Sequence, residues 1–158
     1  MLRLLSIMLM LAVPLIAHAP SARAMGTGAA PTSVANPDYA AAETLIKEWK
    51  YADAIPLLEK VIKAEPENAD AYNQLGYAHR KLNKLPEAKS HYARALSITP
   101  DHKGALEYQG ELFLMLDDLK SAEANLARLD KLCFFGCAEY TDLKKAIAEY
   151  KQRKGITS

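Results

Sequence analysis

The sequence predicts an all-α fold, an α-solenoid of three helical hairpins closed by a C-terminal capping helix. From Tyr39 onward the chain is rich in Ala, Leu, Glu and Lys at helical spacing, and short breaks recur about every 14 to 20 residues. The chain also matches itself when it is shifted by about 34 residues, and the match needs no insertion. A fixed period of this length is typical of stacked helical repeats.

The first 24 residues have the pattern of a secretory signal peptide. Arg3 precedes an apolar run from Leu4 to Ala17, and small residues stand at the candidate cleavage sites. The run, about 14 residues long, is shorter than the roughly 18 that a membrane-spanning helix needs. We expect cleavage after Ala24, or alternatively after Ala19. The mature protein would then be exported, in the simplest case to the periplasm, without stable insertion in the membrane.

The mature chain has no excess of basic charge. Removing residues 1–24 takes away two arginines and no acid, so the formal net charge changes from +1 to −1. This balance argues against a nucleic-acid partner and against an anionic membrane surface. Residues 25–37 are uncharged and contain Gly and Pro, which predicts a disordered lead. The repeat domain is expected at 38–153, followed by a tail at 154–158.

Three repeats of equal length fill this region: 35–68, 69–102 and 103–136. The match includes Ala54, Ala88 and Ala122 at one position, and Pro66 and Pro100 at another. Small residues at such a position let two helices approach closely. The prolines are expected to end helices, because Pro cannot continue the backbone hydrogen bonding.

The middle repeat contains the residues of a known signature: Tyr72, Leu75, Gly76, Ala88, Tyr92, Ala95 and Pro100. In type and spacing they resemble the tetratricopeptide repeat. The resemblance implies a solenoid whose inner face, lined by the first helix of each repeat, binds partner proteins. The chain departs from the family at Trp49, where Gly is usual, and at Phe134, where the closing Pro is usual. His79 stands where the family usually has Tyr, and we expect it to be partly buried.

Pro56 is hard to place in a helix. If the second helix of the first repeat begins at Tyr51, Pro56 falls beyond the first turn, where it removes a hydrogen bond. We therefore expect this helix to begin late, near Asp53, or to be slightly kinked.

Residues 138–153 are predicted to form the capping helix. One face of this helix is apolar and comprises Tyr140, Leu143, Ala146, Ile147 and Tyr150, and the opposite face is charged. A solenoid needs such a helix at its end, because the last hairpin would otherwise expose its apolar side to water.

Cys133 and Cys137 are the only two cysteines. Gly136 indicates that a helix stops near Cys133 and that a tight loop follows. In an oxidising compartment this loop can close as a disulfide that holds the capping helix in place. Two alternatives are a reducible pair for thiol exchange and a Cu(I) site. However, the spacing is not C-x-x-C and no His stands nearby.

The implied groove would be lined by ten residues of the first helices. They are Tyr39, Glu43 and Lys47 in the first repeat, Asn73, Tyr77, Arg80 and Lys81 in the second, and Glu107, Glu111 and Leu114 in the third. In the middle repeat they share one stripe, because they follow the spacing i, i+4, i+7 and i+8. The groove is basic in the middle and acidic toward the third repeat, so we expect a protein or peptide segment of mixed charge as partner.

Family members that clamp C-terminal carboxylates carry Lys, Arg and Asn at defined groove positions. Here those positions are occupied by Tyr39, Glu43, Asn73, Tyr77, Glu107 and Glu111. This departure argues against a carboxylate clamp.

The leading hypothesis is a non-catalytic scaffold for protein–protein interaction in the bacterial cell envelope. The alternative is a thiol-redox or copper helper in envelope protein maturation that uses Cys133 and Cys137. The sequence contains no Gly-rich phosphate loop, nucleophile elbow or zinc helix motif, so we expect neither an enzyme nor a cofactor. The sequence leaves open whether copies of the chain associate.

Overall fold

The computed structural model describes residues 36–156, which form seven α-helices and no strand. The helices are α1 (Pro37–Lys47), α2 (Tyr51–Ala64), α3 (Ala69–Lys81), α4 (Leu85–Ile98), α5 (Lys103–Met115), α6 (Leu119–Leu132) and α7 (Ala138–Lys154). Within this part of the chain, no helix combines the length and apolar character needed to cross a membrane. The expected signal peptide, and the expected lead up to residue 35, lie outside the described residues.

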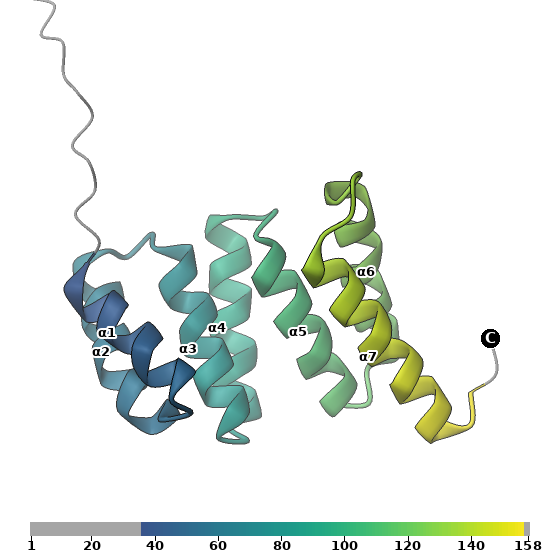
Figure 1. The fold of residues 1–158 in the computed structure, drawn as a ribbon, viewed down its shortest axis with the longest axis horizontal. Helices are drawn as coiled ribbons and strands as arrows, with labels where there is room; N and C mark the ends of the chain where they lie inside the picture. The colour runs from purple at the N-terminus through teal and green to yellow at the C-terminus, as the bar shows by residue number, and fades with distance from the viewer. Residues whose placement is uncertain (1–35, 157–158) are drawn as a thin grey trace, which may run out of the picture. The chain divides into compact units, whose positions relative to one another are not determined.

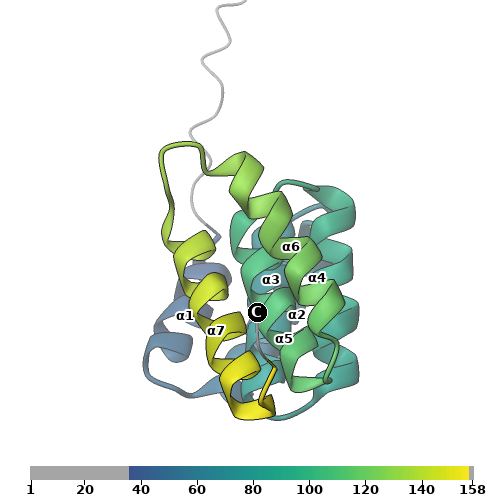
Figure 2. The ribbon, with the colours of Figure 1, turned by 90° about the vertical axis from the view of Figure 1, so that its right-hand side faces the viewer.

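The helices pair into three hairpins, α1–α2, α3–α4 and α5–α6, which stack in chain order (Figure 1). The first helices of successive hairpins contact one another, and α7 continues this row by packing against α5 and α6. Viewed along the stack, α1 and α7 lie on one side, and α2, α4 and α6 lie on the other (Figure 2). The helices that carry the candidate residues therefore form one face of the all-α solenoid that the sequence predicts.

The period of the sequence reappears in the turns inside the hairpins. Trp49, Asn83 and Asp117 have φ angles of 64°, 58° and 59°, in the left-handed region. Each turn has the paired backbone hydrogen bonds of a Schellman motif; in the first, Lys50 N–H donates to Leu45 and Trp49 N–H donates to Ile46. The same backbone geometry is thus repeated whichever side chain occupies the position.

Glycines allow the closest helix contacts in the core. A Cβ added at Gly76 would lie 2.6 Å from ring atoms of Tyr92 on α4, and one added at Gly110 would lie 2.6 Å from the methyl groups of Leu143 on α7. Tyr92 and Leu143 are both completely buried. Gly76 thus seats α4 against α3, and Gly110 seats the capping helix against α5.

The expected late start of α2 is wrong. This helix begins at Tyr51 and includes Pro56 in its interior. Pro56 leaves the carbonyl of Ala52 without its usual donor, but Ala52 is exposed in the first helical turn, where water is available. The buried residues Ala54, Leu58 and Val61 hold the helix against the core.

The two ends of the described region differ slightly from the expected boundaries. Pro37 already belongs to α1, and the Asn36 side chain caps this helix by accepting hydrogen bonds from Asp38 and Tyr39 N–H. The capping helix extends to Lys154 and ends at Gly155, which adopts the left-handed conformation that favours glycine.

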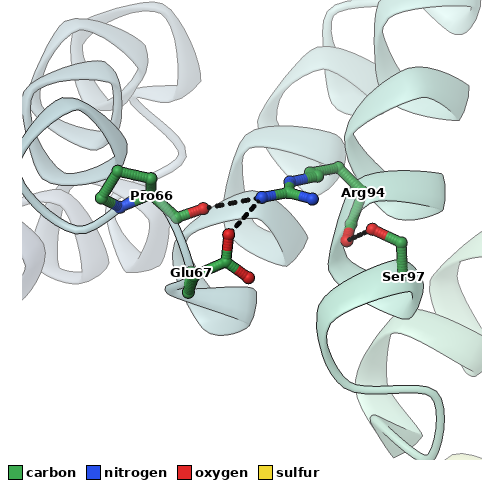
Figure 3. A network of polar contacts seen from close by, with 4 residues as sticks. All are labelled: Pro66, Glu67, Arg94 and Ser97. Atoms are coloured by element: carbon green, nitrogen blue, oxygen red, sulfur yellow. Dashed lines mark hydrogen bonds and ion pairs between the residues drawn. The ribbon is translucent and has the colours of Figure 1, made fainter.

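Arginines bind the two loops that join successive hairpins. Arg94 donates hydrogen bonds to the Pro66 carbonyl at 3.2 Å and to the Glu67 carboxylate at 2.6 Å (Figure 3). Arg128, at the same position of the next repeat, donates in the same way to the carbonyl of Pro100. The second helix of each following repeat thus holds the preceding loop in place.

Candidate functional site

The candidate groove residues lie on three neighbouring helices. Tyr39, Glu43 and Lys47 belong to α1, Asn73, Tyr77, Arg80 and Lys81 to α3, and Glu107, Glu111 and Leu114 to α5. Helix α3 contacts both α1 and α5. Seven of the ten residues line two pockets along this face, and the other three, Tyr39, Asn73 and Glu107, do not.

The first pocket has a volume of about 360 Å³ and lies between α1 and α3. Four of its lining residues belong to the ten expected ones: Glu43, Lys47, Tyr77 and Lys81. The other five do not: Ile46, Trp49, Tyr51, Gln74 and Tyr108. The pocket combines aromatic rings with two ammonium groups and one carboxylate, and such a composition suits the binding of protein side chains.

Three tyrosine rings form a connected wall of this pocket. The ring centres of Tyr51 and Tyr77 are 5.9 Å apart in an edge-to-face arrangement, and those of Tyr77 and Tyr108 are 4.9 Å apart. The Lys81 ammonium lies 5.3 Å from the centre of the Tyr77 ring. Each aromatic pair is worth roughly 0.5–1.5 kcal/mol beyond its buried area, so these contacts order the wall in the free protein.

Trp49 also borders the first pocket and is 80% exposed. Its φ of 64° is uncommon for a bulky residue. An exposed indole in a disfavoured conformation beside a pocket indicates a binding residue more than a packing residue.

The second pocket, of about 260 Å³, contains Arg80, Glu111 and Leu114 together with Met115, Ala146, Glu149 and Arg153. Arg80 is only 9% exposed. Its guanidinium forms a 2.6 Å ion pair with Glu111 and lies 5.5 and 5.6 Å from the ring centres of Tyr77 and Tyr108. Arg80 therefore lies inside the protein between the two pockets, and the Glu111 carboxylate already neutralises its charge.

Several carboxyl groups lie close together where α5 packs against α7. Glu107 is only 8% exposed, and burial raises the pKa of its carboxyl to about 8, with nearby Glu111, Asp142 and Glu139 acting in the same direction. Asp142 and Glu139 come from the capping helix, and neither was expected in the groove. The capping helix thus adds negative charge to the face as well as covering the third hairpin.

Besides Arg80 and Glu107, three further expected groove residues are directed more toward the interior than the sequence implied. Asn73 is 6% exposed, and its Oδ1 has no hydrogen-bond partner among the described residues. Leu114 is buried, although it still lines the second pocket. Tyr39 packs against the buried apolar residues that α1, α2 and α3 share, and burial raises its pKa to about 12.

The repeat itself contains the signal for two of the residues that sequence reasoning missed. Gln74 and Tyr108 occupy the same position in successive repeats, and each directly follows an expected groove residue, Asn73 or Glu107. At this repeat position, the residue that lines the pocket is therefore the one after the residue that the sequence predicted. Tyr51 was missed because it begins α2, and only the first helices were expected to line the groove.

Two larger hollows lie away from this groove. One, of about 540 Å³, is formed mainly by the loop after α2. The other, of about 690 Å³, lies between α6 and α7, where Lys151 is paired with Glu123 at 2.6 Å. None of the ten candidate residues lines either hollow.

The histidines and cysteines of the described residues line neither of the two groove pockets. His79 is buried and stacks on His91 with 5.1 Å between the ring centres, and burial lowers the pKa of both rings. Across residues 36–156, no three His, Cys, Asp or Glu side chains are grouped so that they could hold a metal ion. The Cys133 and Cys137 sulfurs are 2.09 Å apart, directly before α7.

Comparison with known proteins adds three relationships. The chain is 33% identical over 85 residues to heat shock protein STI1 of Saccharomyces cerevisiae, a match that spans 54% of this chain and 14% of that protein. The first tetratricopeptide domain of Spaghetti (RPAP3), solved with the HSP90 peptide SRMEEVD, superposes with a TM-score of 0.65 at 20% identity, covering 75% of this chain and 90% of that one. PcrH, solved with the chaperone-binding region of PopD, superposes with a TM-score of 0.63 at 19% identity, covering 74% and 90%.

The family model of the tetratricopeptide repeat matches residues 39–103 and 73–132. Together these segments cover more than half of the chain and include both pockets' residues on α1, α3 and α5. The chain is therefore a member of the tetratricopeptide repeat family.

Proposed function

We propose that this protein is a non-catalytic scaffold that binds a flexible segment of a partner protein along the face formed by α1, α3, α5 and α7. The observation that carries this proposal is the first pocket, where Tyr51, Tyr77 and Tyr108 form an ordered wall beside the exposed Trp49. Two relatives of this fold were solved with bound protein segments, an HSP90 peptide and a region of PopD. These complexes support a protein segment as the class of partner.

The charges of the face indicate the chemistry of that segment. Lys47 and Lys81 stand beside the aromatic wall, whereas the capping-helix carboxylates Glu139 and Asp142 lie near Glu107. A segment with an acidic and an apolar residue at one end and a basic residue at the other complements this arrangement. Arg80 is already paired with Glu111, so the anchoring role falls to the aromatic residues.

The groove is formed before a partner binds. Its helices are held by the core, and its tyrosines are held by one another. Only the partner segment must then lose conformational freedom on binding, which favours the affinity of a preformed site for a flexible ligand.

We also propose that residues 1–24 direct export and that Cys133 and Cys137 form a structural disulfide in the mature protein. The apolar run after Arg3 supports export, and the 5.5 Å separation of the two Cα atoms suits a disulfide. Cell fractionation and N-terminal sequencing of the purified protein test export. Retention of Met1 on the mature chain, or accumulation in the cytoplasm, would exclude it.

Substitution of Tyr77 tests the groove. Tyr77→Ala removes the central ring of the wall, and we expect it to abolish recovery of the partner that wild-type protein captures after crosslinking in living cells. Tyr72→Ala is the matched control: Tyr72 lies on the same helix but packs near His91, away from both pockets. Thermal melts verify that both variants fold. Equal capture by wild type and Tyr77→Ala would refute the groove assignment.

A further inference from the structure

Arg80 reaches from α3 to α5 and is almost completely buried between the two helices. Its Nη1 atom lies 2.6 Å from the carboxylate of Glu111 on α5. Its guanidinium carbon lies 5.5 Å from the ring centre of Tyr77 and 5.6 Å from that of Tyr108. One planar cation therefore contacts two of the three rings that form the wall of the first pocket.

The other two repeats have an apolar residue at this position. The residues 34 positions before and after Arg80 are Ile46 on α1 and Leu114 on α5. Ile46 packs against the buried apolar residues that α1, α2 and α3 share, and Leu114 is buried. The packing of the solenoid is thus compatible with a hydrophobic side chain at this position and does not by itself require an arginine.

The burial of Arg80 is not optimal for stability. Its Nε is buried without a hydrogen-bond partner among residues 36–156. Replacing a buried ion pair by well-packed apolar side chains is often neutral or stabilising. A buried cation with an unsatisfied donor, at a position that is apolar in the neighbouring repeats, indicates a role other than stability.

The geometry indicates that this role is to hold aromatic rings in place. Tyr77 and Tyr108 come from different helices, and both side chains are partly exposed where they line the first pocket. A cation that lies over an aromatic ring attracts it, most strongly where water is excluded. Because Glu111 fixes the guanidinium, the guanidinium can fix both rings relative to each other.

We propose that Arg80 is a positioning residue of the groove: its planar guanidinium, held by Glu111, keeps Tyr77 and Tyr108 where they bind a partner segment. This inference rests on the proposed function of the groove and adds how its wall is maintained. Arg80 acts through the two rings and not by pairing with an acidic residue of the partner.

The chain provides a test variant and a matched control. R80L/E111Q removes the cation and the carboxylate together, so neither is left without its partner. Leucine is also the residue that the third repeat has at the position of Arg80. The control is R94L/E67Q, because Arg94 is likewise paired with Glu67 at 2.6 Å and lies 5.6 Å from the ring centre of Tyr72, outside both groove pockets.

Fluorine NMR of the purified chain labelled with 3-fluorotyrosine tests the positions of the rings and needs no partner. Substitution of single tyrosines by phenylalanine assigns the signals. We expect R80L/E111Q to shift the signals of Tyr77 and Tyr108 and to leave that of Tyr72 unchanged. R94L/E67Q should shift the signal of Tyr72 alone.

A binding measurement tests the consequence for the groove. The partner that wild-type protein captures after crosslinking in living cells is identified by mass spectrometry, purified and titrated. We expect R80L/E111Q to weaken binding roughly tenfold, because rings that are no longer held must be ordered on binding. R80K should weaken it severalfold, since an ammonium group can pair with Glu111 but is not planar. R94L/E67Q should leave it unchanged, and thermal melts verify that each variant folds.

The inference and the proposed function fail in different ways. Unshifted signals of Tyr77 and Tyr108 in R80L/E111Q, or wild-type affinity of this variant, would overturn the positioning role even if Tyr77→Ala abolishes binding. Weaker binding without shifted signals would mean that Arg80 contacts the partner directly. Wild-type affinity of Tyr77→Ala would refute the groove function, and the inference with it. If R80L/E111Q does not fold, R80K must shift both signals and weaken binding for the inference to hold.

Discussion

Three residues at one repeat position differ in how well they tolerate the same backbone conformation. Trp49, Asn83 and Asp117 all adopt left-handed φ angles. Asn and Asp visit this region readily because their short side chains bond locally, but a Trp has no such compensation. The indole of Trp49 is mostly exposed, so packing in the free protein does not offset the cost. Its position beside the first pocket offers a functional reason for its presence.

Trp49→Gly should therefore stabilise the protein while weakening partner binding. The left-handed conformation costs a non-glycine residue roughly 1–2 kcal/mol, and the greater freedom of unfolded glycine returns part of it, so we expect a gain of about 0.5–1 kcal/mol. Urea denaturation measures the gain. Asn83→Gly is the matched control and should change stability less. A Trp49→Gly variant that is less stable than wild type would show that the indole packs.

The loss of stability caused by a glycine-to-alanine substitution should depend on which atoms the new methyl group contacts. Gly76→Ala places it against the Tyr92 ring and should destabilise by roughly 1–3 kcal/mol. Gly110→Ala meets the rotatable methyl groups of Leu143, and its effect should be smaller. At Gly104 the nearest atom is 3.3 Å away, so Gly104→Ala should change stability least. Thermal melts give the order, and equal melting temperatures for Gly76→Ala and Gly104→Ala would contradict it.

At the scale of elements, α7 covers the third hairpin and also carries carboxylates close to Glu107. Leu143, Ile147 and Tyr150 are buried against α5 and α6, and the carboxylates are those of Glu139 and Asp142. The loop that leads into α7 determines where the helix begins, because Cys137 caps it through a hydrogen bond from Tyr140 N–H. The position of α7 thus affects both the stability of the third repeat and the electrostatics of the face.

Replacing both cysteines separates a structural disulfide from a chemical role. For a loop of this length, the chain-entropy estimate gives a loss of about 2 kcal/mol for Cys133→Ser with Cys137→Ser. We expect a lower melting temperature under non-reducing conditions and unchanged capture of the groove partner. Wild-type protein treated with dithiothreitol should melt like the variant. Loss of partner capture in a folded double variant would instead favour the thiol or copper alternative.

For the whole molecule, buried ionisable groups limit stability from both sides of neutral pH. Burial raises the pKa of Glu107 from its ordinary 4.5 to about 8, so the folded state holds a proton that the unfolded state releases. Stability therefore falls as pH rises between about 4.5 and 8. Burial lowers the pKa of His79 and His91 below 6.5, so the unfolded state binds protons more readily and stability falls as pH drops below that value.

Glu107→Gln should remove the loss of stability that accompanies a rise in pH. The amide cannot ionise, so we expect the variant to lose less stability than wild type between pH 6 and pH 8.5. As pH falls from 6.5 to 4.5 the variant should lose more than wild type, because protonated Glu107 no longer offsets the loss at His79 and His91. Urea denaturation at several pH values measures both slopes. Glu123→Gln on α6, paired with Lys151, is the control. Parallel profiles for wild type and Glu107→Gln would show that Glu107 is already ionised at pH 6.

The sequence by itself determined the repeat and its consequences. A fixed period with Gly76, Ala88 and Tyr92 specifies helices, hairpins and the need for a cap, because these depend on local spacing and on apolar faces that one hairpin cannot bury. Three of the residues that the same spacing selects, Tyr77, Lys81 and Glu43, line a pocket. Local patterns suffice for these features because residues close in sequence form them.

Only the tertiary structure decided which polar residues of the first helices line the pockets. Neighbouring positions on a helix differ by about 100°, so a stripe read from sequence is uncertain by one residue, and packing against the next repeat resolves it. Asn73 and Glu107 consequently lie inside, while Gln74 and Tyr108 line the pocket. The burial of Arg80 between Tyr77, Tyr108 and Glu111 likewise depends on contacts between α3 and α5, which chain spacing alone does not specify.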